Sequence, residues 1–352
     1  MTELTMTKNL KDRLPLWLAK IIYYEYWPVN AFYFPFSFYW LFLSIRARSL
    51  TYYTAVNPGI AHSGFWGDSK SAILKKIPVE FLPFTVYVDA ADEPEDIFTS
   101  LEKAGICFPV VCKPDKGERG YKVEKINYAE ELISYLSSAK GRLIIQEYVT
   151  HPLELGILYY RLPDGTKREI TSVVKKEFLS VTGDGASTVA ELMNSSLRAR
   201  FQVESTEKKL GEQMNHVLAR GKKLLIEPIG NHSRGTEFLN ANHLINAQLL
   251  SVFDTLAAKT DGVYYGRFDL KVKSLEDLYA GKNMKIMELN GVTSEPAHIY
   301  GQDMNLLKAT RSVLFHSNIL FRIAMQNKKR GVEFAPLFPF VKHLLAYRAS
   351  LR

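Results

Sequence analysis

The chain has 352 residues, of which 47% are hydrophobic and 23% are charged, and its formal net charge is +8. This length is enough for two or three packed subdomains. Cys107 and Cys112 lie in one apolar run, which predicts buried thiols in a reducing compartment and excludes a disulfide framework. Cysteine and histidine do not show metal-ligand spacing, and no nucleic-acid-reading motif accompanies the positive charge. We therefore expect a cytoplasmic protein that meets an anionic membrane or anionic substrates, with no nucleic acid partner.

An uncharged aromatic run, YWPVNAFYFPFSFYWLFLSI, occupies residues 26–45, and Arg46 and Arg48 follow it. Its length approaches that of a membrane span, but two prolines interrupt it and its aromatic side chains prefer the membrane–water interface. We expect an interfacial or re-entrant anchor that holds the protein at the inner face of the membrane. A single span, with the main body in the cytoplasm, is one alternative. A buried aromatic hairpin or a homodimer contact is the other.

The run ICFPVVCK predicts a strand over residues 106–113, and a polar turn with Gly117 and Gly120 follows it. Glycines let backbone N–H groups approach phosphate oxygens closely, and Lys113 at the base of the turn adds positive charge. The pattern is not that of a Walker loop. Taken alone, such a turn is more often an ordinary surface feature than a phosphate site.

A second strand is predicted over residues 142–149, RLIIQEYV. At its end, Glu147, Tyr148 and Val149 could form a hinge whose backbone groups pair with a purine edge. Glu154 could then accept hydrogen bonds from ribose hydroxyls. Each of these residues alone is better explained as the end of a strand followed by a solvated acid.

Two strand-like runs near residues 263–272 and 285–290 carry the motifs Arg267-Phe-Asp269 and Glu288-Leu-Asn290. Alternate side chains of a strand share a face. If the two runs pair as a hairpin, an arginine, two carboxylates and an amide converge. Carboxylates and phosphate oxygens suit Mg²⁺, and arginine suits phosphate. A solvated amphipathic surface hairpin is the plainer interpretation of this motif by itself.

Taken in order, these motifs resemble the ATP-grasp superfamily over roughly residues 65–310. The resemblance implies an α+β fold in which two α+β subdomains clasp ATP. It implies that Lys70 and Lys113 contact the nucleotide and that a loop with Gly117 and Gly120 closes over the phosphates. The implied nucleotide and metal residues are Lys70, Lys113, Gly117, Gly120, Glu147, Tyr148, Val149 and Glu154 for ATP, and Asp269, Glu288 and Asn290 for two Mg²⁺ ions, for which Mn²⁺ can substitute.

Two further segments, Thr182–Leu192 and Asn231–Thr236, are similar to segments of cyanophycin-synthetase-like, bifunctional glutathione-synthetase-like and D-alanine–D-alanine-ligase-like members. Thr236 departs from that pattern, because a second glycine is usual there. Lys175 or Lys176 would contact phosphate, and the sequence does not choose between them. The implied catalytic residues are Arg267, Arg234 and Lys176. Arg234 and His298 are candidates for holding the substrate carboxylate or amine.

The resemblance implies an ATP-dependent ligase that joins a carboxylate to an amine through an acyl phosphate. A lipid-linked or cell-envelope substrate would follow from a membrane anchor. The alternatives are a kinase-like ATP-grasp phosphotransferase and a non-catalytic, membrane-bound nucleotide-binding protein. The expected segments are an aromatic N-terminal segment (1–54), an α/β lead-in (55–105), a small subdomain with the glycine loop (106–150), a large subdomain with the metal site (151–312) and a basic, apolar tail (313–352).

Overall fold

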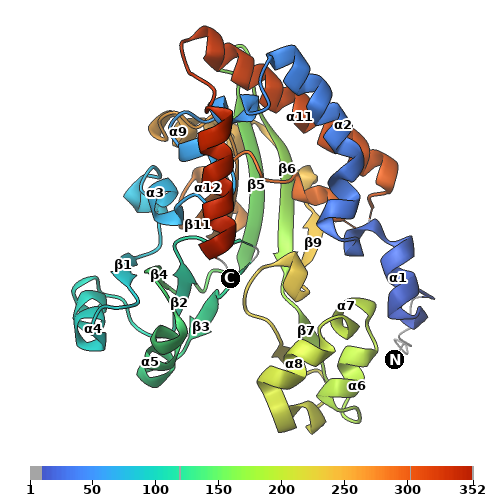
Figure 1. The fold of residues 1–352 in the computed structure, drawn as a ribbon. Helices are drawn as coiled ribbons and strands as arrows, with labels where there is room; N and C mark the ends of the chain where they lie inside the picture. Colours follow the sequence, from blue (N-terminus) through green and yellow to red (C-terminus); the bar gives the residue numbers. More distant parts are fainter. Residues whose placement is uncertain (1–9, 119, 302, 351–352) are drawn as a thin grey trace. The chain divides into compact units, whose positions relative to one another are not determined.

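The computed structural model describes residues 10–118, 120–301 and 303–350, which fall into two compact units (Figure 1). The smaller unit combines the described residues up to Pro35 with Glu177–Glu237. The larger unit is formed from the segments 36–176 and 238–352. Both units are discontinuous in the sequence, whereas the expected segments were consecutive. The expectation of an α+β protein is confirmed.

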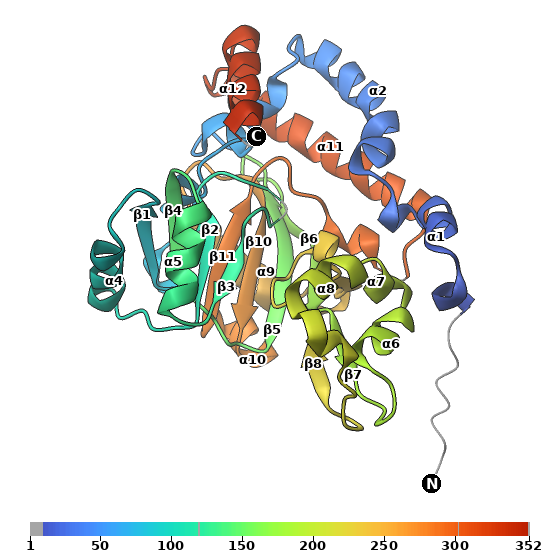
Figure 2. The same ribbon diagram turned by 60° about the horizontal axis from the view of Figure 1, so that its bottom comes forward.

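A five-stranded sheet with the order β11-β10-β5-β6-β9 forms the centre of the larger unit (Figure 2). Neighbouring strands from β11 to β6 pair antiparallel. The bounds of its strands are Leu153–Arg161 (β5), Arg168–Glu177 (β6), Glu237–Asn240 (β9), Tyr265–Val272 (β10) and Met284–Asn290 (β11). A turn at residues 163–165 separates β5 from β6, and the expected hairpin of β10 and β11 is confirmed.

One face of this sheet carries most of the apolar side chains of its strands. Leu155, Ile157 and Tyr159 of β5 point to this face, where they share a core with Phe253 of α9 (Ala247–Lys259) and Leu278 of α10 (Leu275–Ala280). The opposite face is divided along the strands. At the far end of β5, Leu158 and Tyr160 pack in a second core with α11 (Leu306–Lys329) and the last turns of α2 (Val29–Ala47). The near end of the same face carries charged residues.

The larger unit also contains a four-stranded sheet with the order β1-β4-β2-β3. The strands are Thr85–Asp89 (β1), Val110–Pro114 (β2), Glu124–Ile126 (β3) and Arg142–Glu147 (β4). The helices α4 (Pro94–Lys103) and α5 (Ala129–Ser138) cover its apolar face through residues such as Ile97 and Leu132. Because β1 pairs with β4, the region expected as a lead-in contributes a strand to the sheet that carries Lys113.

The smaller unit holds a two-stranded sheet of β7 (Ser180–Thr182) and β8 (Lys223–Leu225) and the helices α1 (Leu16–Ile22), α6 (Val189–Asn194), α7 (Leu197–Arg200) and α8 (Val203–Leu210). Glu25 joins its two segments, because its carboxylate lies 2.7 Å from Arg198 of the second segment; it also lies 2.8 Å from Lys11 of its own segment. Helix α6 begins at Val189, because Thr188 caps it in a capping box with Glu191.

The aromatic run 26–45 falls mostly in α2, which has Pro35 in its interior. Leu43, Ser44 and Ala47 are buried, whereas Leu41, Phe42 and Ile45 are exposed. The helix therefore packs on one side, as the buried alternative requires, and keeps an apolar outer side. Among the described residues, no helix combines the length and hydropathy needed to cross a bilayer.

Candidate active site

The hairpin of β10 and β11 brings the two expected motifs together. Asp269 lies directly opposite Glu288, and Arg267 lies directly opposite Asn290. Phe268, Leu270 and Leu289 alternate with them and are buried in the apolar core, which fixes the polar residues on the other face. This register brings a cation, two carboxylates and an amide together, as the sequence motifs suggested.

Gly156 makes room for this cluster. It lies opposite Asp269 on the neighbouring strand β5. A Cβ atom at this position would meet Val174 at 3.0 Å, Asp269 Oδ1 at 3.2 Å and Arg267 Cδ at 3.5 Å. The first two distances are tighter than normal van der Waals contacts, so a larger residue would displace the aspartate or the valine. The missing side chain thus lets the carboxylate and the guanidinium lie flat against the sheet.

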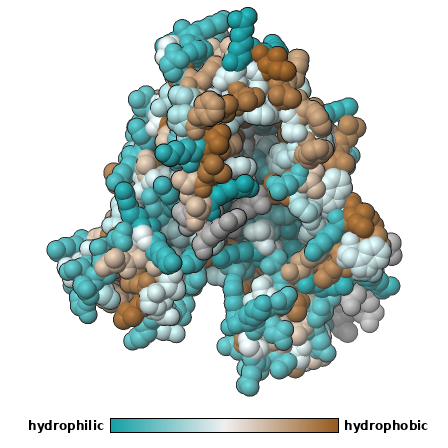
Figure 3. Space-filling model, in the orientation of Figure 1, coloured by the Kyte–Doolittle hydropathy of each residue, from teal (hydrophilic) through white to brown (hydrophobic). Residues whose placement is uncertain are grey.

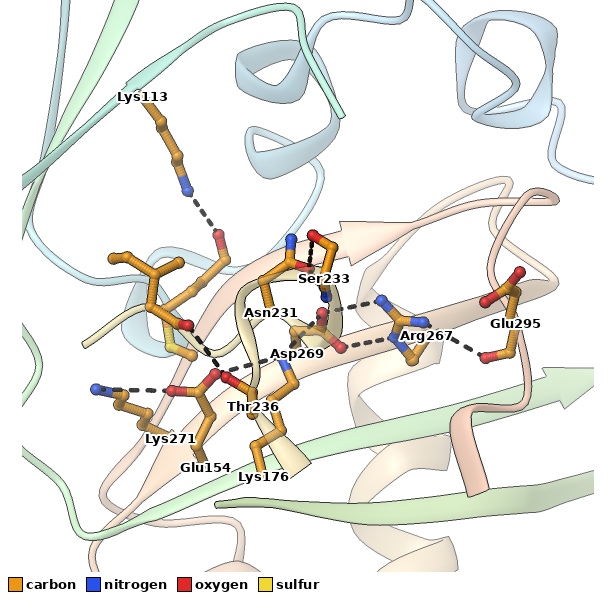
Figure 4. Close-up of polar contacts among 12 residues, drawn as sticks. Lys113, Glu154, Lys176, Asn231, Ser233, Thr236, Arg267, Asp269, Lys271 and Glu295 are labelled. Carbon is orange, nitrogen blue, oxygen red and sulfur yellow. Dashed lines mark hydrogen bonds and ion pairs between the residues drawn. The ribbon is translucent and has the colours of Figure 1, made fainter. Parts of the chain in front are cut away.

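Asp269 is held between two cations (Figure 4). Arg267 donates to it through Nε at 2.8 Å and Nη2 at 3.1 Å, and Lys176 Nζ lies 3.3 Å away. All three side chains are largely buried. Burial by itself raises the pKa of Asp269, but Arg267 and Lys176 outweigh burial and hold the pKa below its usual value. The carboxylate is therefore ionised at neutral pH and oriented by its partners.

Glu154 and Lys271 extend the charged cluster. Glu154 lies 3.2 Å from Lys176 Nζ and 3.7 Å from Lys271 Nζ, and its side chain is only 7% exposed. Lys271 also donates to the carbonyl oxygen of Val149 at 3.0 Å and lies over the ring of Tyr148 at 4.9 Å. Lys271 thereby connects the expected hinge with the expected ribose acid. Burial lowers the pKa of Lys271, and Glu154 opposes this effect.

A bulge in β11 links the two sheets of the larger unit. The register of β10 and β11 shifts between Asp269 and Leu270, which leaves Met287 without a direct partner. Its carbonyl oxygen accepts a hydrogen bond of 3.0 Å from Lys113 Nζ at the end of β2 (Figure 4). Burial lowers the pKa of Lys113 to about 8, and the charge of Glu288 opposes this effect. The expected strand lysine therefore reaches the metal motif.

The loop after β2 is attached to helix α3 (Lys70–Leu74). Asp115 accepts hydrogen bonds from the backbone N–H of Ser71 at 2.7 Å and from the hydroxyl of Ser69 at 3.0 Å. Lys70 Nζ donates to the carbonyl oxygen of Gly117. Gly117 and Gly120 both have positive φ values, of 151° and 73°, which favour glycine. The structure thus brings the early lysine, Lys70, to the glycine loop.

The hinge residues follow β4 as expected. The backbone N–H of Glu147 donates to Phe84, and its carboxylate accepts from the backbone N–H of Phe84 at 3.0 Å. Glu147 therefore ties the ends of β4 and β1 together with its side chain. Val149 is buried, and Tyr148 lies between Lys271 and Lys125, whose ammonium groups are 4.9 and 4.4 Å from its ring centroid.

Of the remaining predicted residues, one joins the charged cluster and the others lie outside it. Of the two adjacent lysines, Lys176 joins the charged cluster, whereas strand alternation places Lys175 on the opposite face. Arg234 belongs to the smaller unit, where it lies 3.5 Å from Glu227. His298 is buried, with its backbone N–H bonded to Ser172, and burial lowers its pKa.

Two contacts of the site were not predicted from the sequence. Lys271 lies two residues after Asp269 in the same strand, so the sequence places it on the charged face. Its contact with Glu154 depends on the pairing of β10 with β5, which the sequence does not give. The contact of Lys113 with Met287 depends on the bulge in β11, and no motif marks that bulge in the sequence.

No protein-family model matches the chain, and no curated protein matches its sequence. Among solved structures, it is similar to a bifunctional glutathione synthetase from Pasteurella multocida, with 16% identity, a TM-score of 0.38 and coverage of 74% of this chain. The chain spans only 38% of that protein. It is also similar to a D-alanine–D-alanine ligase from Bacillus anthracis, with 16% identity, a TM-score of 0.40 and coverage of 74% of this chain and 67% of the ligase.

A D-Ala:D-Ser ligase from Enterococcus faecalis is similar at 13% identity and a TM-score of 0.41, with 72% of this chain and 61% of that one covered. Each of these three neighbours is named as a synthetase or a ligase. Likeness at these identities and TM-scores does not decide the activity of this chain. The activity is therefore proposed from the residues of the charged sheet face.

Proposed function

We propose that this chain is an ATP-dependent ligase that joins a carboxylate to an amine and releases ADP and phosphate. The single observation that supports the proposal best is the buried charged face of the central sheet. Five cations, Arg267, Lys176, Lys271, Lys113 and Lys70, lie near four carboxylates, Asp269, Glu154, Glu288 and Glu295. Buried charges are rarely left unbalanced in a protein. The positive excess fits a polyanionic ligand such as the phosphates of ATP.

The phosphates would meet lysines and backbone amides. Lys113 and Lys70 both contact backbone carbonyl oxygens, which are weaker partners than phosphate oxygens. Both lysines lie next to the loop that holds Gly117 and Gly120. This loop would close over the phosphates and exclude water from the reacting centre.

Asp269, Glu288 and Asn290 fit a site for Mg²⁺. Carboxylate and amide oxygens are the ligands that this ion prefers. Among the described residues, the buried Nδ2 atom of Asn290 has no hydrogen-bond partner, so this side-chain amide is available for a further partner. When bound, Mg²⁺ neutralises phosphate charge, and we propose two ions, with Mn²⁺ as a possible substitute.

The proposed reaction has two steps. A carboxylate oxygen of the substrate attacks the γ-phosphorus of ATP, so that a P–O bond forms and the bond to ADP breaks. The amine nitrogen then attacks the carbonyl carbon of the acyl phosphate, phosphate leaves, and the nitrogen loses a proton. Arg267 would stabilise the charge that develops on the transferred group, an effect worth about 3–4 kcal/mol per donor. Lys176 would keep Asp269 in place.

The adenosine end would lie along the hinge. Backbone groups near Tyr148 and Val149 would pair with the purine. Glu154 would accept the ribose hydroxyls, and Lys176 and Lys271 already orient its carboxylate. Arg234 remains our candidate for the substrate carboxylate, and His298 is a candidate for either substrate.

An ADP-release screen of amino acids, short peptides and amino lipids in detergent tests the proposal. We expect ADP release to require both a carboxylate and an amine and to disappear in Glu288→Gln. A matched control is Glu295→Gln, which changes a nearby acid whose carboxylate accepts from Tyr300. ADP release without any amine would favour a phosphotransferase. Full activity in Glu288→Gln would refute the proposed metal site.

We also propose that the protein binds the inner membrane surface and acts there on a lipid-linked or cell-envelope precursor. Three apolar side chains on the outer side of α2, Leu41, Phe42 and Ile45, are 44%, 51% and 69% exposed. Helix α12 (Leu337–Ser350) exposes a second apolar strip that includes Phe338 and Leu345 (Figure 3). Arg46 and Arg48 follow the first strip, as an anionic interface requires.

Co-sedimentation with vesicles that contain anionic lipid tests this second proposal. Ile45→Glu combined with Leu41→Glu should reduce the bound fraction at least tenfold. Val79→Glu is the matched control, because Val79 is an exposed apolar residue outside both strips. Equal binding of the double variant and the control, or a stable dimer in solution that buries α2, would refute membrane binding by this helix.

A further inference from the structure

Three side chains far apart in the sequence meet outside the charged sheet face. His62 and Asp68 lie in the segment that precedes α3, and His343 lies in the middle of α12. One ligand atom from each residue can be chosen so that all three atoms lie within 4.8 Å of one another. All three residues belong to the larger unit. Two imidazoles and one carboxylate form a set that binds transition ions in proteins.

The separations are close to those of metal ligands. His62 Nδ1 lies 3.5 Å from Asp68 Oδ1, and His343 Nε2 lies 3.9 Å from the same oxygen. Ligands bound tetrahedrally at about 2.0–2.1 Å from Zn²⁺ are roughly 3.3 Å apart. Side-chain rotations that move each atom by less than about 1 Å would therefore complete the arrangement.

The cluster contains buried polar atoms without hydrogen-bond partners. Among the described residues, neither His62 Nδ1 nor Asp68 Oδ2 makes a hydrogen bond, and both atoms are buried. The Asp68 side chain is only 6% exposed, and burial raises its pKa to about 7. Unsatisfied polar atoms of this kind are rare in native proteins, because leaving them without a partner destabilises the fold. A cation held between the three side chains would satisfy both atoms.

His343, the third residue of the cluster, makes only a weak polar contact in the structure. His343 Nε2 lies 3.3 Å from the backbone carbonyl oxygen of Trp66, which is a long contact for a hydrogen bond. His62 has a φ of 44°, a left-handed conformation that is uncommon for a residue other than glycine. Phe340 packs against the His62 ring at 5.2 Å and keeps the two segments together.

We propose that His62, Asp68 and His343 form a binding site for a transition-metal ion of the Zn²⁺ class, with a position left open for water. The two imidazoles favour Zn²⁺ or Co²⁺ over Mg²⁺, which prefers oxygen ligands. The site is separate from the Asp269 cluster and does not depend on the proposed ligase activity. The distance between the ligands in the sequence explains why no metal-ligand spacing was visible there.

An ion in this site would fasten α12 to the segment that supports the glycine loop. The same segment continues into Ser69 and Ser71, which bind Asp115 at the start of that loop. Tyr347, one turn beyond His343, packs on Gly67, where a Cβ would meet the ring at 2.7 Å. An ion bound by these three residues would therefore help to hold the glycine loop in place.

Metal binding by the untagged full chain, stripped with a chelator and kept free of ATP, tests the proposal. We expect one Zn²⁺ per chain after dialysis, measured by elemental analysis, and visible absorption on adding one equivalent of Co²⁺. Asp68→Asn and His343→Asn should each weaken Co²⁺ binding at least tenfold. His243→Asn is the matched control, because His243 is exposed and outside the cluster.

Two further measurements separate the possible results. Glu288→Gln should keep the Zn²⁺ stoichiometry, which distinguishes this site from the proposed Mg²⁺ site. Circular dichroism of the metal-free variants checks that they are folded. If one variant does not fold, the Co²⁺ spectrum of the wild type still shows whether the chain binds the metal ion. The proposal is overturned if the wild type binds no Co²⁺, or if a folded Asp68→Asn variant binds Co²⁺ as tightly as the wild type.

Discussion

Replacing Asp269 by asparagine isolates the energetic role of the charged cluster. The substitution keeps the size of the side chain but removes the negative charge between Arg267 and Lys176, which lie 2.8 and 3.3 Å from it. An amide NH₂ would then face one of the two buried cations. Removing one partner of a buried ion pair destabilises a protein by about 3–5 kcal/mol. We expect a loss of this size in the absence of any ligand.

Thermal unfolding measured by circular dichroism provides the assay. At roughly 2 °C per kcal/mol for a unit of this size, the apparent Tm of Asp269→Asn should fall by roughly 6–10 °C. Asp254→Asn is the matched control, because Asp254 pairs with the exposed Arg168 at 2.8 Å and keeps an acceptor for Tyr159. An exposed pair contributes about 0–1 kcal/mol, so the control should lose at most about 2 °C.

A double variant sharpens the test. Lys176→Gln removes one of the two cations that Asp269→Asn leaves without a full partner. The combined variant should therefore lose less stability than the sum of the two single losses, with a coupling of about 1 kcal/mol or more. Equal losses for Asp269→Asn and Asp254→Asn, or strict additivity in the double variant, would refute the cluster as described.

Three other substitutions and conditions give separate outcomes. Gly156→Ala should lower kcat roughly 10–100-fold, with a smaller effect on folding, because the added methyl group displaces Asp269. Steady-state ADP release measures kcat. An unchanged kcat would contradict the crowding at Gly156. Raising the pH from 7 to 9 should weaken ATP binding about tenfold by calorimetry, since burial lowers the pKa of Lys113 to about 8. Because that pKa is lowered, burying charged Lys113 destabilises the fold below pH 8, and this cost fades as the pH rises toward 10.5. Asn57→Ala should lower the apparent Tm by several degrees, since fully buried Asn57 bonds the backbone of Tyr265; no change would contradict its structural role.

Local patterns predicted the elements that rely on local physics. Alternation around Phe268 and Leu289 predicted the β10–β11 hairpin and its polar face, because the period of a strand is set by its own backbone. Such features depend on neighbours in the sequence and can be derived from it.

Contacts between distant segments could not be derived in this way. The choice between Lys175 and Lys176 depends on the register of β6 against β5, which the local sequence leaves open. The partner of Lys113 is a backbone carbonyl that only a bulge exposes. Which side chains of α2 are buried depends on its packing against α11.

The interrupted larger unit has a consequence for how the protein is made. Strand β5 ends at Arg161, yet its partner β10 begins at Tyr265, after the smaller unit's long segment has been synthesised. At about 5–20 residues per second, this edge of β5 waits on the order of 10 s for its partner. An unpaired edge is a template for association with other chains. The nascent protein should therefore depend on chaperones during this interval, and slowing translation between the two strands should increase aggregation.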